Sequence, residues 1–308
     1  MSRLCEGRVC IVTGAGGGIG REYALLLAEH GARVVVNDVG AAVDGSGAST
    51  GPAMSVVAEI TARGGEAVAN SDDVSSWDGA ERLVRQAIDT YGRLDVLVNN
   101  AGILRDRMLV NMTEQEWDDV VRVHLKGTFA PTRHAAAYWR DRRKAGDEVD
   151  ARVINTSSVS GLYGNAGQSN YGAAKMGIAG FTQIAAEELG RYGVTVNAIA
   201  PGGLTRMSKL TAIGGVQNLT DAEREAMSPR LMAPVCVWLA SNESRAITGR
   251  VIEAQPAVMA VAEGWHRGPS SPPPGTPEEV GPILLGLVAA ARPAADIHGR
   301  DKEQPVTT

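Results

Sequence analysis

The stretch RVCIVTGAGGGIG, residues 8–20, decides which fold we expect for this chain. Four of its first five residues are apolar, as in a short buried strand, and a helical pattern runs from Ile19 to His30. The glycines between them let the backbone turn sharply and approach a ligand closely. A strand that passes through a glycine-rich turn into a helix is typical of an α/β fold that binds a phosphate group at the helix start.

The same order of strand and helix repeats along the chain. We predict short apolar strands at residues 8–12, 32–36, 66–69, 94–98, 152–155, 194–199 and 250–253. Helices are predicted at residues 19–30, 52–63, 76–91, 114–142 and 170–191. Such alternation implies parallel pairing with right-handed crossovers. The sequence therefore predicts the α/β class, with a single doubly wound Rossmann-type parallel sheet flanked by helices.

Two segments depart from this rhythm. Residues 40–52 are rich in glycine, alanine and serine and exceed the usual strand-to-helix loop of about 2–6 residues. The tail after Trp265 contains three consecutive prolines and a helical candidate at 277–291, and we expect residues 296–308 to be disordered. Because no internal repeat is present, we divide the chain into one domain, residues 1–265, and a proline-rich C-terminal extension, residues 266–308.

The composition of the 308 residues, 44% hydrophobic and 21% charged, is that of a soluble globular protein. A net charge of −5 gives no electrostatic basis for binding nucleic acid or an anionic membrane. No run approaches the roughly 18–20 apolar residues of a membrane span, and residues 1–8 do not resemble a signal peptide. The three scattered cysteines, Cys5, Cys10 and Cys236, favour buried thiols over disulfides or a metal site. We therefore expect a reducing, cytoplasmic environment.

The glycine-rich turn predicts a dinucleotide site, because free amides at a helix start attract a pyrophosphate. Asp38 ends the second strand, where its carboxylate would accept hydrogen bonds from the adenosine ribose and repel a 2′-phosphate. Of the arginines nearby, Arg21 is a possible phosphate ligand, whereas Arg33 begins the same strand and should lie at the opposite end of the sheet. We therefore expect NAD rather than NADP.

Two further strand ends supply candidate cofactor contacts. Asp73, followed by Val74, could meet the adenine amino group, although Asp72 competes for that role and Asp73 or Ser75 could equally cap the next helix. Asn99 could tie neighbouring strands together, while the small residues after it would leave room for the cofactor. The residues expected to hold the dinucleotide are Gly14, Gly16, Gly18, Ile19, Gly20, Asp38, Asp73, Val74, Asn100, Ala101 and Gly102.

Tyr171 and Lys175 are the strongest candidates for chemistry, with Ser158 thirteen residues before the tyrosine. A phenol and an ammonium four residues apart share one helix face, where the lysine charge would lower the pKa of the phenol. Ser158 would hold a substrate oxygen beside that phenol. Tyr163 lacks a lysine four residues later and is interpreted as a pocket wall. With the glycine turn and the NNAG segment, this set predicts hydride transfer between an alcohol or ketone and a nicotinamide.

These motifs resemble the short-chain dehydrogenase/reductase family over residues 4–265. The resemblance is carried by TGAGGGIG, Asp73-Val74, NNAG, Ser158, YGAAK from Tyr171 and IAPGG from Ile199. Other segments are similar to the (3R)-hydroxyacyl-CoA dehydrogenase part of the peroxisomal multifunctional enzymes of type 2 and their bacterial relatives. These are VVVNDVG at 34–40, RGGEAVAN at 63–70, VHLKG at 123–127 and YGNAGQSNY at 163–171.

The resemblance implies an enzyme that oxidises a (3R)-3-hydroxyacyl-CoA or a steroid-derived thioester, or else a hydroxysteroid dehydrogenase. It makes Ser158, Tyr171 and Lys175 catalytic, and its spacing favours Ser158 over the adjacent Ser157. His124 stands where the family carries a catalytic asparagine, and it either completes a proton relay or packs in the core.

The family also adds expected cofactor contacts at Pro201, Gly202 and Thr205, together with Tyr171 and Lys175. Residues 204–232, rich in methionine and leucine, would form the substrate loop or an ordinary packing helix. The resemblance further implies a homodimer or homotetramer built on helices 114–142 and 170–191. The tail could then cross to the site of a neighbouring subunit. The alternative from another class, a non-catalytic NAD-binding sensor or scaffold, is disfavoured by the intact serine, tyrosine and lysine.

Overall fold

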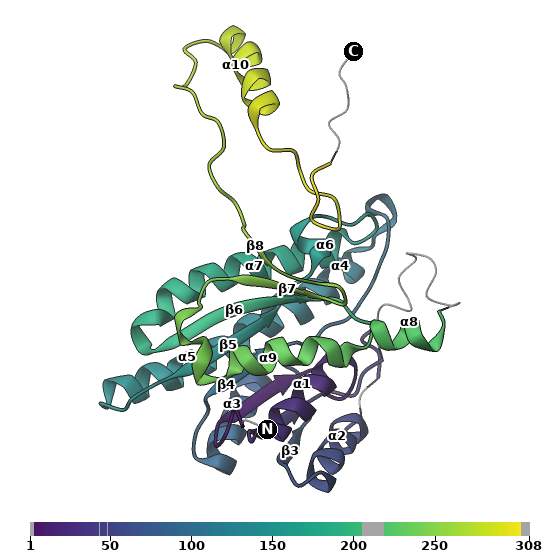
Figure 1. Ribbon diagram of the computed structural model, residues 1–308, viewed down its shortest axis with the longest axis vertical. Helices are drawn as coiled ribbons and strands as arrows, with labels where there is room; N and C mark the ends of the chain where they lie inside the picture. The colour runs from purple at the N-terminus through teal and green to yellow at the C-terminus, as the bar shows by residue number, and fades with distance from the viewer. Residues whose placement is uncertain (1–2, 43, 48, 205–218, 303–308) are drawn as a thin grey trace.

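The computed structural model describes residues 3–42, 44–47, 49–204 and 219–302. Its centre is an eight-stranded sheet in the order β3-β2-β1-β4-β5-β6-β7-β8 (Figure 1). The first seven strands are parallel, and β8 runs antiparallel to β7 at one edge. The strands are β1 (Val9–Thr13), β2 (Arg33–Asn37), β3 (Glu66–Asn70), β4 (Val96–Asn99), β5 (Ala151–Thr156), β6 (Val194–Pro201), β7 (Val251–Gln255) and β8 (Val258–Ala262). The predicted doubly wound α/β sheet is confirmed, whereas β8 was not expected from the sequence.

Helices cover both faces of the sheet, because the parallel strands are apolar on both sides. One face carries α1 (Gly18–Glu29), α2 (Gly51–Ala62) and α9 (Ala233–Ala240). The other carries α3 (Trp77–Tyr91), α5 (Gly127–Lys144) and α7 (Ser169–Leu189). The helix α9 was not predicted, because its residues are apolar all round and show no helical period. Among the described residues, no helix is both long and apolar enough to cross a membrane.

The helix predicted over residues 114–142 is not continuous. It consists of α4 (Glu114–Val121), a π-helical turn η2 (Arg122–Lys126) and α5. A π-helical turn holds an extra residue and therefore rotates the side chains on either side of it, and such turns are common at functional sites. Here the turn includes His124, whose side chain is buried. The prediction of one long helix was wrong because hydrophobic periodicity does not report a single inserted residue.

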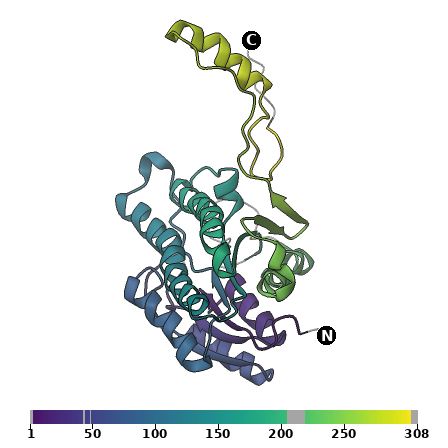
Figure 2. The ribbon, with the colours of Figure 1, turned by 90° about the vertical axis from the view of Figure 1, so that its left-hand side faces the viewer.

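The residues after β8 form an arm that stands away from the body (Figures 1 and 2). It contains α10 (Pro277–Ala290), close to the predicted helix, and none of the residues of α10 is buried. The chain then returns to the body, where residues 295–301 form a closed turn held by the pairing of Ala295 with Asp301. The prediction of disorder from residue 296 was therefore wrong for residues 296–302, because a β-bridge and an aspartate-centred turn fix that segment.

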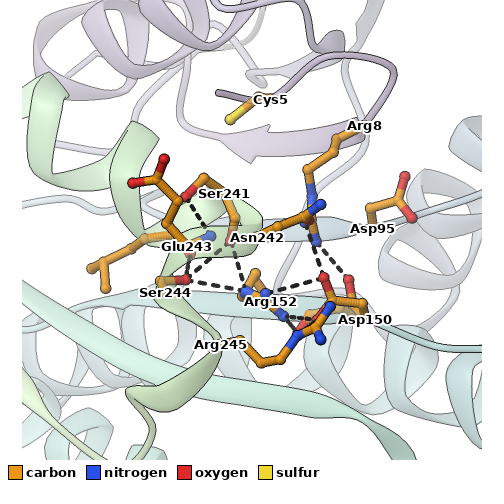
Figure 3. Close-up of polar contacts among 12 residues, drawn as sticks. Cys5, Arg8, Asp95, Asp150, Arg152, Ser241, Asn242, Glu243, Ser244 and Arg245 are labelled. Carbon is orange, nitrogen blue, oxygen red and sulfur yellow. Dashed lines mark hydrogen bonds and ion pairs between the residues drawn. The ribbon is translucent and has the colours of Figure 1, made fainter. Parts of the chain in front are cut away.

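A buried polar network fastens the amino ends of β1 and β5 to the segment after α9 (Figure 3). Arg152, at the start of β5, donates from Nε to the Ser241 carbonyl and the Ser244 hydroxyl, both at 3.1 Å. Its other two nitrogens bind the Asp150 carboxylate at 2.7 and 3.1 Å. Arg8 donates to the Asp150 carbonyl at 2.6 Å. The network joins three segments at the amino ends of the strands, and the glycine-rich turn lies at their carboxyl ends.

Candidate active site

The glycine-rich turn between β1 and α1 lies against the end of β4. A Cβ atom at Gly14, where φ is +63°, would lie 2.7 Å from the Cα atom of Ala101, and a Cβ at Gly20 would lie 2.4 Å from Asn100 Nδ2. The same Nδ2 donates to the carbonyls of Thr13 and Gly14 at 3.0 and 3.2 Å. These contacts require glycine at both positions, and they join the two sequence motifs in space.

The turn leaves backbone amides available for a dinucleotide. No side chain caps α1 at Gly17, so the first amides of the helix face outward without an internal acceptor. An uncapped helix start that follows a glycine turn attracts a pyrophosphate. Of the predicted contacts, Gly18 and Ile19 begin α1, whereas Gly16 lies in the turn and its amide is engaged by Asp38. These residues fit the binding of a dinucleotide.

Asp38 follows β2 beside this turn. Its two carboxylate oxygens accept from the amides of Gly16 and Gly40 at 2.8 and 2.7 Å, which fixes the side chain. Arg21, the possible phosphate ligand, is paired instead with Glu22 and Glu59. A fixed carboxylate with no arginine bound to it suits a ribose that carries two free hydroxyls.

Arg33 lies where the sequence predicted, at the other end of β2. There its guanidinium donates to the Gly7 carbonyl and lies 5.4 Å from the ring centre of Tyr91. The expected position of Arg33 is confirmed, and this arginine cannot approach a phosphate at the carboxyl end of the sheet.

The region after β3 corrects one expectation. Ser76 caps α3 by accepting from the amide of Gly79, so neither Asp73 nor Ser75 is the helix cap. Asp73 instead accepts from the amide and the hydroxyl of Ser75 at 2.8 and 2.6 Å and pairs with Arg122 at 3.1 Å. The wrong expectation arose because Asp73, Ser75 and Ser76 all lie within four residues of the helix start and only backbone geometry selects the cap.

Asp72 and Val74, the neighbours of Asp73, each make contacts that limit their role in binding a cofactor. Asp72, the competitor of Asp73, is paired with Arg82 at 2.7 Å. Val74 is buried, and its side chain belongs to the core beneath α3 and α5, so only its backbone could meet a ligand.

Asn99 connects β4 to its surroundings. Its Nδ2 donates to Asn155 Oδ1 on β5 and to Thr132 Oγ1 on α5, both at 2.9 Å. The structural interpretation of Asn99 is therefore confirmed. At the end of β6, the amide of Gly202 donates to the Ala254 carbonyl at 2.8 Å, next to Pro201. The other contact expected here, Thr205, lies outside the described residues, as does most of the expected substrate loop at 205–218.

Ser158, Tyr171 and Lys175 come together at the carboxyl end of β5. Ser158 caps α6 (Val159–Leu162), accepting from the Ser160 amide at 3.2 Å, while Tyr171 and Lys175 occupy the first two turns of α7. Lys175 is 3% exposed, donates to the Thr156 carbonyl at 2.6 Å and lies 5.6 Å from the centre of the Tyr171 ring. The three side chains have the geometry of a proton-transfer site.

Ser157 and Ser158 are separated by their hydrogen bonds. The hydroxyl of Ser157 is buried and donates to the backbone carbonyl of Lys175 at 2.9 Å. This bond ties β5 to α7 and occupies the only proton of that hydroxyl. Ser158 uses its oxygen as an acceptor and keeps its proton for another partner. The contacts therefore favour Ser158 for holding a substrate oxygen.

Burial sets the pKa of both titrating groups. It lowers the pKa of Lys175 to about 7 and raises the pKa of Tyr171 above its usual value, although the hydrogen bond from Ser158 opposes the latter shift. The sequence predicted that the lysine charge lowers the pKa of the phenol. That expectation neglected burial, which disfavours the charged forms of both side chains.

His124 projects from η2 toward the tyrosine. The two rings are edge to face, with centres 5.2 Å apart. Its Nε2 contacts the amide and the carbonyl of Ile103 at 3.1 and 2.7 Å. Burial, followed by the charge of Lys175, lowers the pKa of the imidazole to about 3. His124 is thus a neutral ring, whose Cε1 lies only 2.2 Å from where a Cβ atom at Gly102 would stand.

Tyr163 has a role that the sequence did not indicate. Its hydroxyl donates to Glu253 on β7, and burial together with that carboxylate raises its pKa. The returning tail packs on this ring, since a Cβ atom at Gly299 would lie 3.3 Å from it. Within the described residues, the tail therefore contacts its own chain close to the serine that caps α6.

Sequence reasoning missed Asp106 and Gln168. The Asp106 carboxylate accepts from Gln168 Nε2 at 2.8 Å, across 62 positions of the chain. Asp106 follows the NNAG segment by four residues, and Gln168 precedes Tyr171 by three. Proximity to two motifs was the only signal that could have drawn attention to them.

The comparisons agree with this arrangement. The family model described as short chain dehydrogenase matches residues 8–212. Peroxisomal multifunctional enzyme type 2 of Mus musculus is 44% identical over 260 residues, which are 84% of this chain and 32% of the mouse protein. Hydroxyacyl-CoA dehydrogenase ChsB1 of Mycobacterium tuberculosis is 45% identical over 252 residues, 80% of this chain and 76% of that protein. This chain thus spans about a third of the mouse enzyme's length.

A solved structure extends the likeness into the tail. The crystal structure of a short chain dehydrogenase from Mycobacterium avium has a TM-score of 0.85 and 53% sequence identity, and the match covers 95% of this chain and 98% of that chain. The residues after 265 make up more than a tenth of the sequence, so the match reaches into the arm. By its motifs, its sheet and these comparisons, this chain belongs to the short-chain dehydrogenase/reductase family.

Proposed function

We propose that this protein is an NAD-dependent dehydrogenase that interconverts a secondary alcohol and a ketone, with a (3R)-3-hydroxyacyl-CoA or a steroid-derived thioester as substrate. The observation that carries the proposal is the meeting of Ser158, Tyr171 and Lys175 beside the glycine-rich turn. A non-catalytic sensor would have no need of a buried lysine beside a tyrosine, because burial disfavours its charge.

In the direction of oxidation, Tyr171 takes the hydroxyl proton of the substrate, whose oxygen Ser158 holds by a hydrogen bond. The glycine-rich turn and Asp38 would hold the dinucleotide, whose nicotinamide would supply the acceptor for the hydride from the same carbon. Lys175, 5.6 Å from the tyrosine ring, favours the phenolate whenever the lysine is protonated. In the direction of reduction, Tyr171 returns the proton to the carbonyl oxygen.

His124 supports the site in our proposal as a neutral ring that orients Tyr171. Its low pKa, near 3, disfavours a relay that passes through an imidazolium ion. Its contacts with the Ile103 backbone and the Tyr171 ring instead hold η2 against α7. The catalytic set is therefore Ser158, Tyr171 and Lys175, with His124 as a positioning residue.

Members of the family use NAD or NADP. Our preference for NAD rests on Asp38, which is held by two backbone amides. A carboxylate in this position accepts from the ribose hydroxyls and repels a phosphate on the same ribose. The proposed dinucleotide contacts are the glycine-rich turn, Asp38, Asp73, the NNAG segment and the end of β6.

Acyl-CoA is favoured over a free hydroxysteroid by the names of two relatives, a hydroxyacyl-CoA dehydrogenase and a multifunctional peroxisomal enzyme. The free hydroxysteroid remains the second candidate, since a site that orients one secondary alcohol does not by itself define the rest of the substrate. We further propose that residues 1–265 form the catalytic domain and residues 266–308 its extension. The three buried free cysteines fit a reducing cytoplasm.

A homo-oligomer is supported by the outer faces of α5 and α7. A hollow of about 260 Å³ lies between these helices, lined by apolar side chains that include Phe129, Phe181 and Leu189. Phe129 is 42% exposed, and exposed apolar surface of this kind is typical of subunit interfaces.

The test combines cofactor and substrate in one assay. Purified protein is given NAD or NADP with a (3R)-3-hydroxyacyl-CoA or with a hydroxysteroid, and formation of reduced nicotinamide is followed. We expect turnover with NAD and the thioester. In Asp38→Ser, removal of the charge should improve kcat/KM for NADP relative to NAD by about tenfold or more. Turnover with NADP alone in the wild type would contradict the role of Asp38, and turnover with the steroid alone would reassign the substrate.

A further inference from the structure

The loop after β4 runs across the start of α7 and is fastened to it. The amide of Arg107 donates to the Gly167 carbonyl at 2.8 Å, and Asn170 Nδ2 donates to the Arg105 carbonyl at 3.1 Å. The Asn170 side chain in turn accepts from the amide of Tyr171 at 2.8 Å. These bonds reach α7 immediately before and at the tyrosine, so the position of this loop bears directly on the position of the phenol.

Asp106 adds the one bond of this set that is made between two side chains. Its carboxylate accepts from Nε2 of Gln168, the residue that precedes the first turn of α7. Gln168 is buried, and its backbone forms an isolated bridge with Arg107. The carboxylate is therefore held at the amino end of the helix that carries Tyr171.

The charge of Asp106 is not matched by a nearby cation. Its second oxygen, Oδ1, is buried and has no hydrogen-bond partner among the described residues. The arginines on either side are engaged elsewhere, Arg105 with Asp119 at 3.4 Å and Arg107 with Glu116 at 3.1 Å. A partly buried carboxylate without an ion pair acts on any ionisable group nearby.

Four groups lie near Tyr171 or at the start of its helix. Lys175 approaches the tyrosine ring from the next turn of α7, and the neutral His124 ring approaches it from η2. Ser158 lies at the end of β5, and Asp106 is held at the amino end of α7 by Gln168, three residues before Tyr171. Of these, only Lys175 and Asp106 carry charge, and their effects on the tyrosine are opposite: the ammonium favours the phenolate and the carboxylate favours the phenol.

We propose that Asp106 is a positioning residue of the dehydrogenase reaction, which fixes the first turn of α7 through Gln168 and sets by its charge the pH at which Tyr171 loses its proton. The proposal rests on the proposed function only where it refers to the reaction. The hydrogen bond supplies the position, and the unpaired carboxylate supplies the charge. Burial first, and then the charge of Asp106, raises the pKa of Tyr171, which agrees with this assignment.

The test separates charge from position with two variants. Asp106→Asn keeps the shape of the side chain and an oxygen that can accept from Gln168, but it removes the charge. The rise of kcat/KM with pH should then move to lower pH, while the plateau stays within about threefold of the wild type. Gln168→Leu keeps the charge and removes the bond, so kcat at the plateau should fall by about tenfold, because a small displacement of a reacting group is costly.

A second measurement needs neither cofactor nor substrate. The tyrosinate absorbance of the wild type is titrated, and the same titration of Tyr171→Phe is subtracted to isolate Tyr171. In the Asp106→Asn background this difference curve should move to lower pH. Asp106→Glu, which keeps the charge, should restore the curve toward that of the wild type. As the matched control, Asp147→Asn removes a carboxylate that pairs with Arg142 beyond the end of α5 and should leave the curve unchanged.

The outcomes are distinct. An unchanged or raised titration midpoint in Asp106→Asn overturns the role of the charge, and an unchanged kcat in Gln168→Leu overturns the role of the bond. If the asparagine variant does not fold, Asp106→Ser is titrated in its place and judged by the same criterion. If the tyrosinate titration midpoint shifts in Asp106→Asn but the wild-type protein turns over no alcohol, this inference is supported and the proposed function is contradicted.

Discussion

The two ends of the parallel sheet differ in how their charged side chains are paired. At the amino end, every nitrogen of Arg152 has an acceptor, and the surrounding network joins three separate segments (Figure 3). Two of those nitrogens bind the Asp150 carboxylate. At the carboxyl end, Lys175 donates to a backbone carbonyl and Asp106 accepts from an amide side chain, and neither forms an ion pair within the described residues.

This difference has an energetic meaning. A buried charge without an ion-pair partner is costly, so a fold tolerates one only where another requirement outweighs stability. The carboxyl ends of the strands in an open α/β sheet are where ligands bind. The comparison therefore assigns the amino end to stability and the carboxyl end to function, and substitutions at each end can test that assignment.

The largest effect is expected at the carboxyl end, in Tyr171→Phe. Loss of the hydroxyl removes the group that exchanges the proton, so kcat should fall by about 100-fold or more, while the free energy of unfolding stays close to that of the wild type. Steady-state kinetics and urea unfolding measure the two quantities. Tyr138→Phe, on α5 beside Arg142, is the control with normal activity. A kcat within about threefold of the wild type for Tyr171→Phe would disprove its assignment.

The opposite pattern is expected at the amino end, in Arg152→Met. The substitution leaves Asp150 and two buried acceptors without their cation, so the free energy of unfolding should fall by about 3–5 kcal/mol. The folded variant should keep kcat within about threefold, because the network lies at the amino ends of the strands, away from the tyrosine. Arg143→Met, an exposed arginine on α5, should change stability by less than about 0.5 kcal/mol. A loss of kcat with unchanged stability would reverse the assignment of this end.

The smallest effect is the contribution of Lys175 to the free energy of unfolding, which changes with pH in one direction. Burial lowers its pKa to about 7, from a usual value of 10.5, so between these values the unfolded chain binds more protons than the folded protein. The contribution of Lys175 to stability therefore rises with pH across this window. The free energy of unfolding of the wild type minus that of Lys175→Met should increase by about 2 kcal/mol between about pH 7 and about pH 9.

Denaturant unfolding at several pH values measures this difference. At pH 7 the methionine variant should be the more stable protein although it is inactive, which is the behaviour expected of a residue kept for function. Lys144→Met, at the exposed end of α5, should show no such dependence on pH. A difference that stays flat with pH would mean that Lys175 keeps its ordinary pKa in the folded protein.

Much of the architecture was predictable because it is encoded locally. The alternation of strands and helices, the glycine-rich turn and the ends of β1 and β2 follow from short stretches of sequence, and the doubly wound sheet follows from their order. The family was identified for the same reason, since its motifs are short and contiguous. The expectation for Arg33 also held, because the direction of a single strand determines which of its residues lie at each end.

Other features depend on residues that are far apart in the chain, and these were missed or mistaken. The π-helical turn at η2 and the contact of Gly299 with Tyr163 depend on tertiary packing. The strand β8 was missed although it is local, because it pairs with β7 across a turn of only two residues. The bond between Asp106 and Gln168 spans 62 positions and joins two loops without a pattern of their own.

The sequence by itself determined most of the elements, that the strands pair in parallel in a doubly wound sheet, and that a tyrosine and a lysine share one face of a helix. Those properties depend on residues within one or two helical turns, where backbone geometry fixes the distances. Only the tertiary structure decided which buried polar atoms find partners and in which direction burial shifts the pKa of Tyr171. The reason is physical: desolvation and unpaired charge depend on everything that surrounds a group, and for this site those surroundings come from β4, β5, η2 and α7 together.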